Sequence, residues 1–250
     1  MSYTIAVAGK GGTGKTTVSA LLIQYLKNRS AAPILAIDAD PTANLGEVIG
    51  LTVDSSIGAT LEKFREELPR LPPGVIKNDY LQARLNEVLI EDEKVDLITM
   101  GRKEGAGCYC YPNQILREYM TLLAKSYPYM IIDNEAGMEH LSRKTTQKLD
   151  VLLLVSDATT RGVRTAGGLK ALTVELNLEI KRIYLVICRA PKELNARIIE
   201  EIEKQGLELI QTIPEDYRIL DYIIEGIPLT NLPGDSPAVI AISDLMEKIL

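Results

Sequence analysis

The stretch that decides the fold lies near the start of the chain, where the apolar run Ile5 to Ala8 leads into Gly9-Lys10-Gly11-Gly12-Thr13-Gly14-Lys15-Thr16-Thr17. It matches G-x-x-x-x-G-K-[ST] in full, after an expected strand and at the start of an expected helix. Glycines let the backbone turn its N–H groups around phosphate oxygens, and the helix N-terminus adds partial positive charge. A glycine-rich turn without a ligand is the weaker interpretation, so the stretch predicts a nucleotide-binding α/β domain.

Each type of residue in this loop has an expected task. The Lys15 ammonium reaches the β and γ phosphates, and the Thr16 hydroxyl is the expected Mg²⁺ ligand. We expect backbone N–H groups of the loop and of the first helical turn to contact the remaining phosphate oxygens. The residues given this role are Gly11, Gly12, Thr13, Gly14 and Thr17.

Short aliphatic runs alternate with helix-period segments through most of the chain, which is typical of βαβ units and a mostly parallel sheet. We expect a single P-loop NTPase domain over residues 1–250, with about seven strands, helices on both faces and a charged helical insert at about 54–93. The expected strands are Tyr3 to Ala8, Ile34 to Asp38, Val95 to Met100, Tyr129 to Asp133, Val151 to Val155, Ile183 to Cys188 and Glu208 to Ile213. The expected helices are Thr16 to Asn28, Asn113 to Lys125, Arg161 to Leu176, Lys192 to Lys204 and Ser236 to Leu250.

The composition excludes several classes of protein. The chain has 250 residues, 46% of them hydrophobic and 25% charged, with scattered glycines and prolines, which excludes collagen-like and disordered chains. The net charge of -6 argues against a nucleic-acid binder that relies on broad phosphate neutralisation, which needs a dense Lys/Arg face, and it leaves a local basic patch open. The longest apolar runs are strand-sized and the start of the chain does not resemble a signal peptide, so we expect a cytoplasmic protein without a membrane segment.

Acidic residues follow two of the expected strands. Asp38 and Asp40 leave the second strand beside the phosphate loop, where we expect Asp38 to hold a Mg²⁺-bound water and Asp40 to orient or deprotonate the attacking water. An Asx turn or a helix cap before Leu45 would explain one of these carboxylates but not both. Asp133 ends a later strand, and the Ala136-Gly137 pair after it suits a segment that rearranges during hydrolysis.

Lys10 is a second cation in the loop and need not point at the loop's own phosphates. Here the chain resembles the deviant Walker A class of P-loop ATPases, whose pattern is K-G-G-x-G-K-[ST]. The resemblance implies a homodimer in which Lys10 contacts the nucleotide of the partner subunit, as an arginine finger does, with a rate effect on the order of 10³–10⁵. It also implies that Asp133 contacts Mg²⁺ through water and that the Gly137 amide senses the γ-phosphate. The alternative for Lys10 is a solvated lysine.

The cysteines are better interpreted as metal ligands, redox groups or buried side chains than as a disulfide framework. Cys108 and Cys110 lie two residues apart in a glycine-rich loop, where their thiolates would suit Zn²⁺, Cu(I) or Ni²⁺. A closed site needs four ligands, and Cys188 ends an apolar strand, which leaves His140 as the other soft ligand. Two copies of the pair at a two-fold axis would complete a four-thiolate site. Incidental loop thiols remain the alternative.

The loop motif, Cys108-Tyr109-Cys110 and Gly137-Met138-Glu139-His140-Leu141 together resemble the nickel-insertion accessory ATPases of carbon monoxide dehydrogenase, the CooC type. The resemblance extends over nearly the whole chain. It implies that the paired cysteines bind Ni²⁺ or Zn²⁺ between protomers and that ATP drives metal delivery to the dehydrogenase. Close relatives in this family serve the linked acetyl-CoA synthase, and the sequence does not separate the two targets.

One position departs from the resemblance. In the deviant Walker A class, the strand equivalent to Ile183 to Cys188 commonly ends in Asn followed by Lys or Arg, and the Asn contacts adenine. Here the pair is Cys188-Arg189, so adenine recognition is expected from backbone groups near Ile213-Pro214-Glu215, with Pro214 as its central residue. Arg189 either stacks on the base or is a surface charge.

Two other functions are weighed against the metal-carrying ATPase. A positioning ATPase of the ParA or MinD kind would have the same loop motifs and a basic DNA-binding face or a basic terminal helix. Neither is apparent in an acidic chain that ends Met246-Glu247-Lys248-Ile249-Leu250. An iron protein like nitrogenase reductase would place a cysteine near switch II, and no cysteine lies near Asp133.

Overall fold

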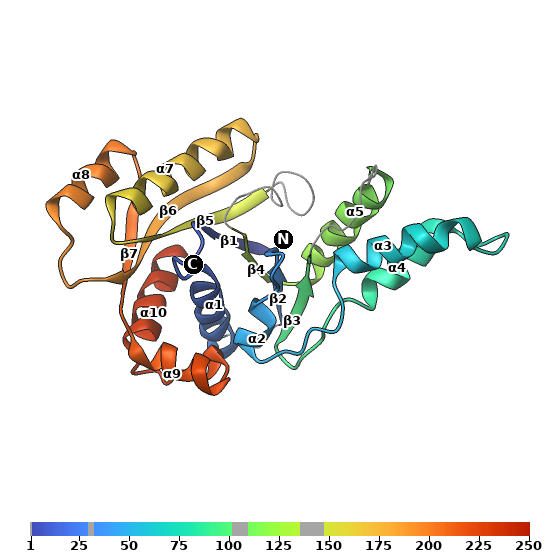
Figure 1. The fold of residues 1–250 in the computed structure, drawn as a ribbon, viewed down its shortest axis with the longest axis horizontal. Helices are drawn as coiled ribbons and strands as arrows, with labels where there is room; N and C mark the ends of the chain where they lie inside the picture. The colour runs from blue at the N-terminus through green and yellow to red at the C-terminus, as the bar shows by residue number, and fades with distance from the viewer. Residues whose placement is uncertain (1, 30–32, 102–109, 136–147) are drawn as a thin grey trace.

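The structure is a computed structural model that describes residues 2–29, 33–101, 110–135 and 148–250. In this part of the chain, seven parallel strands form one sheet in the order β3-β2-β4-β1-β5-β6-β7 (Figure 1). The strands are β1 (Tyr3–Gly9), β2 (Ile34–Asp38), β3 (Val95–Thr99), β4 (Tyr129–Asp133), β5 (Lys148–Asp157), β6 (Glu179–Ala190) and β7 (Leu209–Pro214). The expected α/β fold with a parallel sheet is confirmed.

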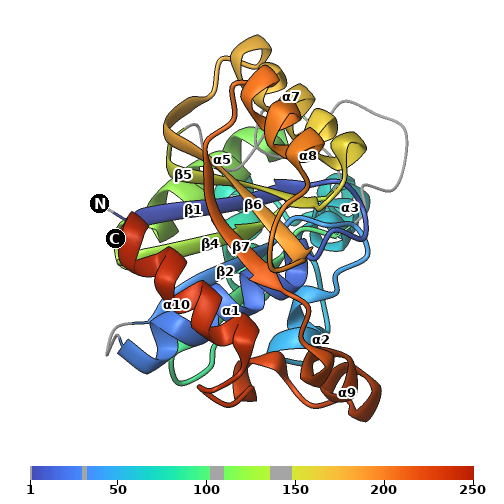
Figure 2. The same ribbon diagram turned by 90° about the vertical axis from the view of Figure 1, so that its left-hand side faces the viewer.

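Helices cover both faces of the sheet, as Figures 1 and 2 show. One face carries α1 (Lys15–Arg29), α2 (Leu45–Ile49), α9 (Tyr217–Glu225), the short η2 (Leu229–Asn231) and α10 (Pro237–Ile249). The other carries α3 (Ile57–Glu67), η1 (Leu68–Arg70), α4 (Lys77–Asn86), α5 (Cys110–Ser126), α7 (Thr160–Glu175) and α8 (Ala196–Lys204). Because both faces are covered, every residue of β2 and of β3 is buried, which explains the lack of polar alternation in their sequences.

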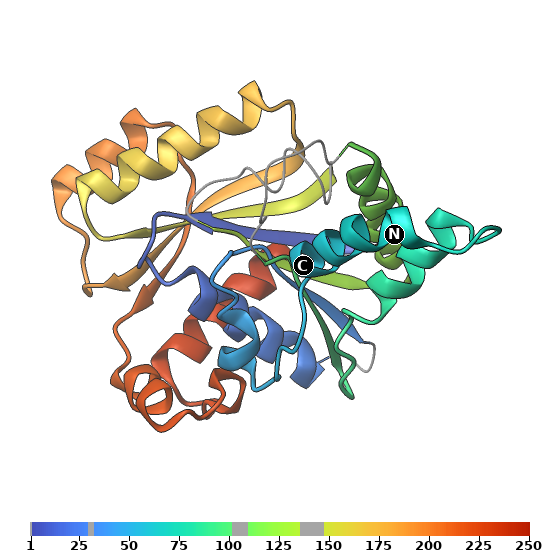
Figure 3. The same ribbon diagram turned by 45° about the vertical axis from the view of Figure 1, so that its right-hand side comes forward.

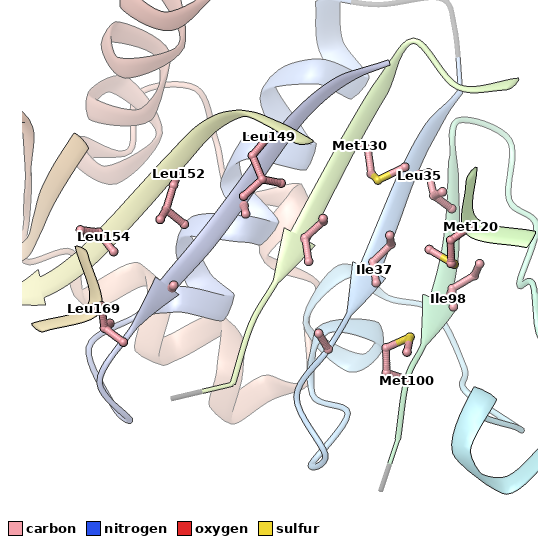
Figure 4. Close-up of a cluster of buried hydrophobic side chains, with 14 of the residues drawn as sticks. Leu35, Ile37, Ile98, Met100, Met120, Met130, Leu149, Leu152, Leu154 and Leu169 are labelled. Carbon is pink, nitrogen blue, oxygen red and sulfur yellow. The ribbon is translucent and has the colours of Figure 1, made fainter. Parts of the chain in front are cut away.

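Side chains that alternate along the strands divide between two hydrophobic cores. In β1, Ile5 and Val7 pack with α1 and α10, whereas Ala6 and Ala8 face the opposite core. Figure 4 shows side chains of this opposite core. Its labelled members are Leu35, Ile37, Ile98, Met100, Met120, Met130, Leu149, Leu152, Leu154 and Leu169. The two cores fix the sheet between its helices, so the carboxyl ends of the strands have defined positions.

Residues 54–93 form the paired helices α3 and α4, which extend beyond the β3 edge of the sheet (Figure 3). Phe64 of α3 and Leu81 of α4 are buried in the same core as the strands. The Tyr119 hydroxyl of α5 donates a hydrogen bond to the Leu85 carbonyl at 3.2 Å. The insert is therefore packed against α5 by apolar and polar contacts.

Some boundaries differ from the expected ones. The helix expected from Lys192 begins at Ala196, because the Asn195 side chain caps it by accepting the Arg197 N–H at 3.0 Å. The strand expected at Ile183 to Cys188 is β6, which extends further at both ends. Two helices, α2 and α9, are not among the expected ones.

The helix α9 matters for the site described below. The Asp216 carboxylate caps it by accepting the Arg218 N–H at 3.1 Å, and it ends at Gly226, whose φ of 66° is left-handed. None of its residues is buried. With nine residues and no buried face it lies below the length at which hydrophobic periodicity is a strong guide.

Candidate nucleotide-binding site

The site lies where the strand order reverses beside β1. In the parallel register, Asp133 at the end of β4 pairs with Val7 of β1 on one side and with Asp38 of β2 on the other. The phosphate loop follows β1 directly, so it shares this edge of the sheet with both carboxylates. Crevices at the carboxyl ends of parallel strands, at such a reversal, are where α/β proteins bind ligands.

The phosphate loop is closed around the main-chain carbonyl of Lys10. This oxygen accepts hydrogen bonds from the Thr13 hydroxyl at 2.8 Å, from the Thr13 N–H at 3.4 Å and from the Lys15 ammonium at 3.4 Å. Gly12 and Gly14 have φ values of 77° and 101°, which only glycine adopts without strain. The two lysines differ in exposure, since Lys15 is buried whereas Lys10 is exposed.

The Mg²⁺ position expected at Thr16 lies against Asp133. The Thr16 hydroxyl donates to one oxygen of Asp133 at 2.7 Å, and the Ser19 hydroxyl donates to the other at 3.1 Å. Burial raises the pKa of Asp133 to about 6, although these hydrogen bonds and the Lys15 charge lower it. A buried carboxylate beside a hydroxyl supplies the oxygen ligands that Mg²⁺ prefers, and the cation would replace the hydration that Asp133 has lost. The residues present therefore fit the ion.

Asp38 is completely buried and both of its oxygens accept backbone hydrogen bonds. One accepts the Asp40 N–H at 3.0 Å and the other accepts the Leu45 N–H of α2 at 2.8 Å. Burial raises the pKa of Asp38 to about 7, against these two hydrogen bonds and with a further increase from Asp133. Asp38 thus fixes the loop that carries Asp40, which is the structural role that the alternative of a helix cap before Leu45 describes.

Asp40 forms an Asx turn. One of its oxygens accepts the Thr42 N–H at 2.8 Å and the Thr42 hydroxyl at 2.6 Å. The expectation that local turns and caps would explain only one of the two carboxylates is therefore wrong, because Asp38 holds α2 and Asp40 holds the turn. Asp40 is partly exposed, and no hydrogen bond to its second oxygen exists within the described residues, so this oxygen can still face a water molecule.

The raised pKa of Asp38 predicts how stability changes with pH. Because its pKa in the folded protein, about 7, exceeds the unfolded value of about 4, folding binds a proton between these limits. Without Mg²⁺, Asp38 makes its full contribution to the free energy of unfolding below pH 4. This contribution decreases as the pH rises through about 7, by on the order of a few kcal/mol. Urea unfolding of the metal-free protein across this range measures it. Asp38→Asn should reduce the slope to the part that Asp133 contributes, because the pKa of Asp133 is also raised, to about 6. The exposed Asp54→Asn should leave the slope unchanged.

A pocket of about 320 Å³ lies beside the phosphate loop, between α1, the ends of β6 and β7, and α9. It brings together Gly14, Thr17, Arg189 and Pro214, which the sequence analysis assigned to nucleotide binding. The remaining lining residues are Val18, Leu21, Cys188, Ile213, Glu215, Asp216, Tyr217, Ile219, Leu220 and Ile223. Those from α9 are missing from the expected site because α9 itself was not expected.

The polar groups of this pocket are few. Cys188 is buried next to Gly14, and burial raises the pKa of its thiol to about 12, so it is a neutral group. Asp216 is occupied as a cap, since its second oxygen accepts the Ser236 hydroxyl. The largely apolar lining of the pocket fits the flat face of a nucleotide base, and main-chain groups and Glu215 are the polar groups that could face the base edge.

Cys188→Asn tests this arrangement. The amide would offer the donor and acceptor pair that matches adenine N6 and N7, and such pairs discriminate between bases by about 1–3 kcal/mol. We expect the affinity for ADP over GDP to increase about tenfold. Calorimetric titration with both nucleotides measures the ratio, and Cys188→Ser serves as the control that adds a hydroxyl without an amide. An unchanged ratio in the Asn variant would show that the base edge does not face position 188.

Several expected site residues lie outside the described part of the chain. These are Cys108, His140 and Gly137, whereas Cys110 is the first residue of α5. Within the described residues, no three His, Cys, Asp or Glu side chains are grouped closely enough to hold a metal ion. The helices that the structure describes include none with the length and apolar character of a membrane span.

The parallel sheet, the glycine loop after β1 and the two carboxylates at its edge define a P-loop nucleotide-binding protein. The family model described as "CobQ/CobB/MinD/ParA nucleotide binding domain" matches residues 4–229, and the chain belongs to this family.

Similar proteins divide between uncharacterized and characterized members. An uncharacterized ATP-binding protein of Methanocaldococcus jannaschii is 42% identical over 248 residues, with 98% of each chain covered. The carbon monoxide dehydrogenase accessory protein CooC of Rhodospirillum rubrum is 29% identical over 226 residues, with 86% of this chain and 84% of CooC covered. The crystal structure of a ParA family ATPase from Chlorobium tepidum has a TM-score of 0.73 at 21% identity, with 97% and 96% covered, a likeness that concerns the fold alone.

Proposed function

We propose that the protein is a cytoplasmic, homodimeric ATPase that carries Ni²⁺ or Zn²⁺ during the maturation of carbon monoxide dehydrogenase or the linked acetyl-CoA synthase. ATP and Mg²⁺ would bind at the phosphate loop and bring two subunits together. The similarity to CooC, whose name describes a carbon monoxide dehydrogenase accessory protein, supports the choice of target. Neither nucleic acid nor a membrane is required as a partner.

The observation that supports the dimeric ATPase within this proposal is that the side chains of Lys10 and Lys15 differ in exposure. Lys15 is buried and its ammonium lies 3.4 Å from the Lys10 carbonyl, inside the loop. The Lys10 side chain is exposed, and none of the hydrogen bonds or ion pairs of the described residues engages its ammonium. The main chain of Lys10 is fixed in the loop while its charged side chain is exposed to solvent, an arrangement that suits contact with the nucleotide of a partner subunit.

The hydrolytic step that we propose uses residues of this chain. The second oxygen of Asp40 would accept a proton from the attacking water, and Asp38 would keep Asp40 in place through the bond to its N–H. Lys15, with Lys10 of the partner, would neutralise charge that develops on the transferred phosphoryl group. Bound Mg²⁺, held by Thr16 and through water by Asp133, would supply further positive charge at the phosphates.

The metal cargo is proposed to bind between subunits. Cys108 and Cys110 from both chains would supply four thiolates, the number that a closed site for a borderline or soft ion requires. Dimer formation would then assemble both the metal site and the hydrolytic centre, so that hydrolysis and metal release are coupled.

Equilibrium dialysis of the full chain with Ni²⁺, and separately with Zn²⁺, tests the metal site. We expect one ion per two chains and loss of binding in the variant Cys108→Ser/Cys110→Ser. Cys188→Ser is the matched control, because its thiol is buried beside the nucleotide pocket, and it should bind the ion as the native protein does. Undiminished binding by the double variant would reject the proposal.

A positioning ATPase is the alternative, because curated proteins named MinD and ParA are also similar to the chain, at 27% and 24% identity. Membrane binding through α10 would need a free apolar face on this helix. In this structure the apolar face of α10, including Ala241, Leu245 and Ile249, is buried against α1 and β7. Binding to vesicles or to DNA in the presence of ATP would favour the alternative.

A further inference from the structure

Arg189 lies where β6 departs from regular pairing with β7. The register shifts between Cys188 and Ala190, and Arg189 between them has a φ of 50°, in the left-handed region that side chains other than glycine rarely adopt. Bulges of this kind re-aim a side chain, and such backbone strain persists only where the surrounding structure enforces it. The strained backbone at Arg189 therefore points its side chain in a direction that a regular β-strand would not give it.

The guanidinium of Arg189 reaches the phosphate loop. It donates a hydrogen bond to the Gly12 carbonyl at 2.9 Å, across 177 positions of sequence. This carbonyl and the Thr13 N–H belong to one planar peptide group and point in opposite directions. The Thr13 N–H in turn donates to the Lys10 carbonyl at 3.4 Å. The peptide between Gly12 and Thr13 is thus held at both of its ends.

The orientation of this peptide matters for anion binding. A carbonyl that turned toward the phosphates would present its negative end to them, whereas one that is bonded to Arg189 cannot turn without losing a charge-assisted hydrogen bond. Because glycine has no side chain, Gly12, whose φ is 77°, lacks the steric restriction that would hold another residue type in one conformation. Arg189 supplies from outside the loop a restraint that the glycine itself lacks.

We propose that Arg189 is a positioning residue that keeps the Gly12 carbonyl of the phosphate loop turned away from bound phosphates. The proposal rests on nucleotide binding at the loop, which is part of the proposed function, and not on metal carriage. Arg189 also lines the pocket beside the loop together with Gly14 and Pro214. One side chain therefore contacts both the phosphate loop and the pocket for the base, and the alternative role is stacking on the base.

Calorimetric titration of the full chain with ADP and with inorganic tripolyphosphate separates these roles, because tripolyphosphate has no base. Arg189→Gly removes the side chain while accepting the left-handed backbone. We expect both ligands to bind about tenfold more weakly, as loss of one charge-assisted hydrogen bond implies. Arg189→Lys should recover part of the affinity. Arg197→Ala, an exposed arginine of α8, is the matched control and should bind both ligands as the native chain does.

Three outcomes would overturn the proposal. One is weaker binding of ADP with unchanged tripolyphosphate, which indicates base stacking. Another is a loss that disappears at high ionic strength, which indicates a simple charge effect, because salt screens exposed charges but not loop geometry. The third is unchanged binding of both ligands in a variant that melts at the native temperature. If the native chain itself binds neither ligand, the proposed function fails at the nucleotide site, a result distinct from failure of the Arg189 variants.

Discussion

Replacing Lys10 by alanine should lower the rate of ATP hydrolysis on the order of 10³-fold while ADP binds with native affinity. The loop depends on the main chain of Lys10, whose carbonyl accepts the bonds from Thr13 and Lys15, and alanine keeps that carbonyl. What is lost is the exposed side chain beyond Cβ, with its ammonium group. Hydrolysis is measured by phosphate release and binding by calorimetry, with the exposed Lys63→Ala of α3 as the control. Lys15→Ala should instead abolish nucleotide binding.

A mixing experiment shows whether Lys10 acts on its own nucleotide or on that of the partner. Lys10→Ala and Asp40→Asn are each expected to be inactive. In a heterodimer of the two, one site combines a native Asp40 with Lys10 of the other subunit, so equal mixing should restore about a quarter of the native rate, since half of the dimers are mixed and each has one complete site. If Lys10 serves its own nucleotide, mixing restores nothing, and the dimeric mechanism is wrong.

The sequence predicted the phosphate loop and its neighbours because their positions follow from chain order. An apolar strand leading into a glycine loop and a helix has one common geometry. The parallel sheet then places the end of β4 beside β1 and the end of β2 beside β4, all at the same edge. Asp38 could therefore be assigned to the site from its place after a strand, whereas the assignment of Asp133 came from the resemblance to the deviant Walker A class. Asp38 accepts a hydrogen bond from the first residue of α2, and Asp133 accepts one from Thr16. These contacts depend on the directions of the side chains, which a pattern of residue types does not predict.

The pocket beside the phosphate loop was less predictable. Pro214 was assigned because Cys188 stands where the deviant Walker A class commonly has Asn. Tyr217 and Leu220 belong to α9, whose nine residues are too few for hydrophobic periodicity to be a strong guide. The contact of Arg189 with Gly12 joins segments that are distant in sequence and arises from a bulge. No local pattern predicts where a parallel pair of strands shifts its register.

Asp40→Asn should lower kcat by about 10²–10⁴ with little change in KM, the effect expected for loss of a general base. Asparagine is nearly isosteric and its carbonyl can still accept the bonds from the Thr42 N–H and hydroxyl, so the Asx turn should remain. What disappears is the capacity of the second oxygen to accept a proton. Single-turnover hydrolysis measures the chemical step, and thermal unfolding shows whether the turn has been kept.

Two controls separate a chemical role from a structural one. Asp40→Ala removes the turn as well as the base, so it should lower both the rate and the melting temperature, whereas Asp40→Asn should lower the rate alone. Asp54→Asn, an exposed carboxylate outside the turn, should change neither. With Mg²⁺ and ATP present, the Asp40→Asn protein should accumulate as a dimer, because the nucleotide that joins the subunits is no longer consumed. A variant that hydrolyses ATP within about threefold of the native rate would remove Asp40 from the mechanism, since a general base contributes at least about 10².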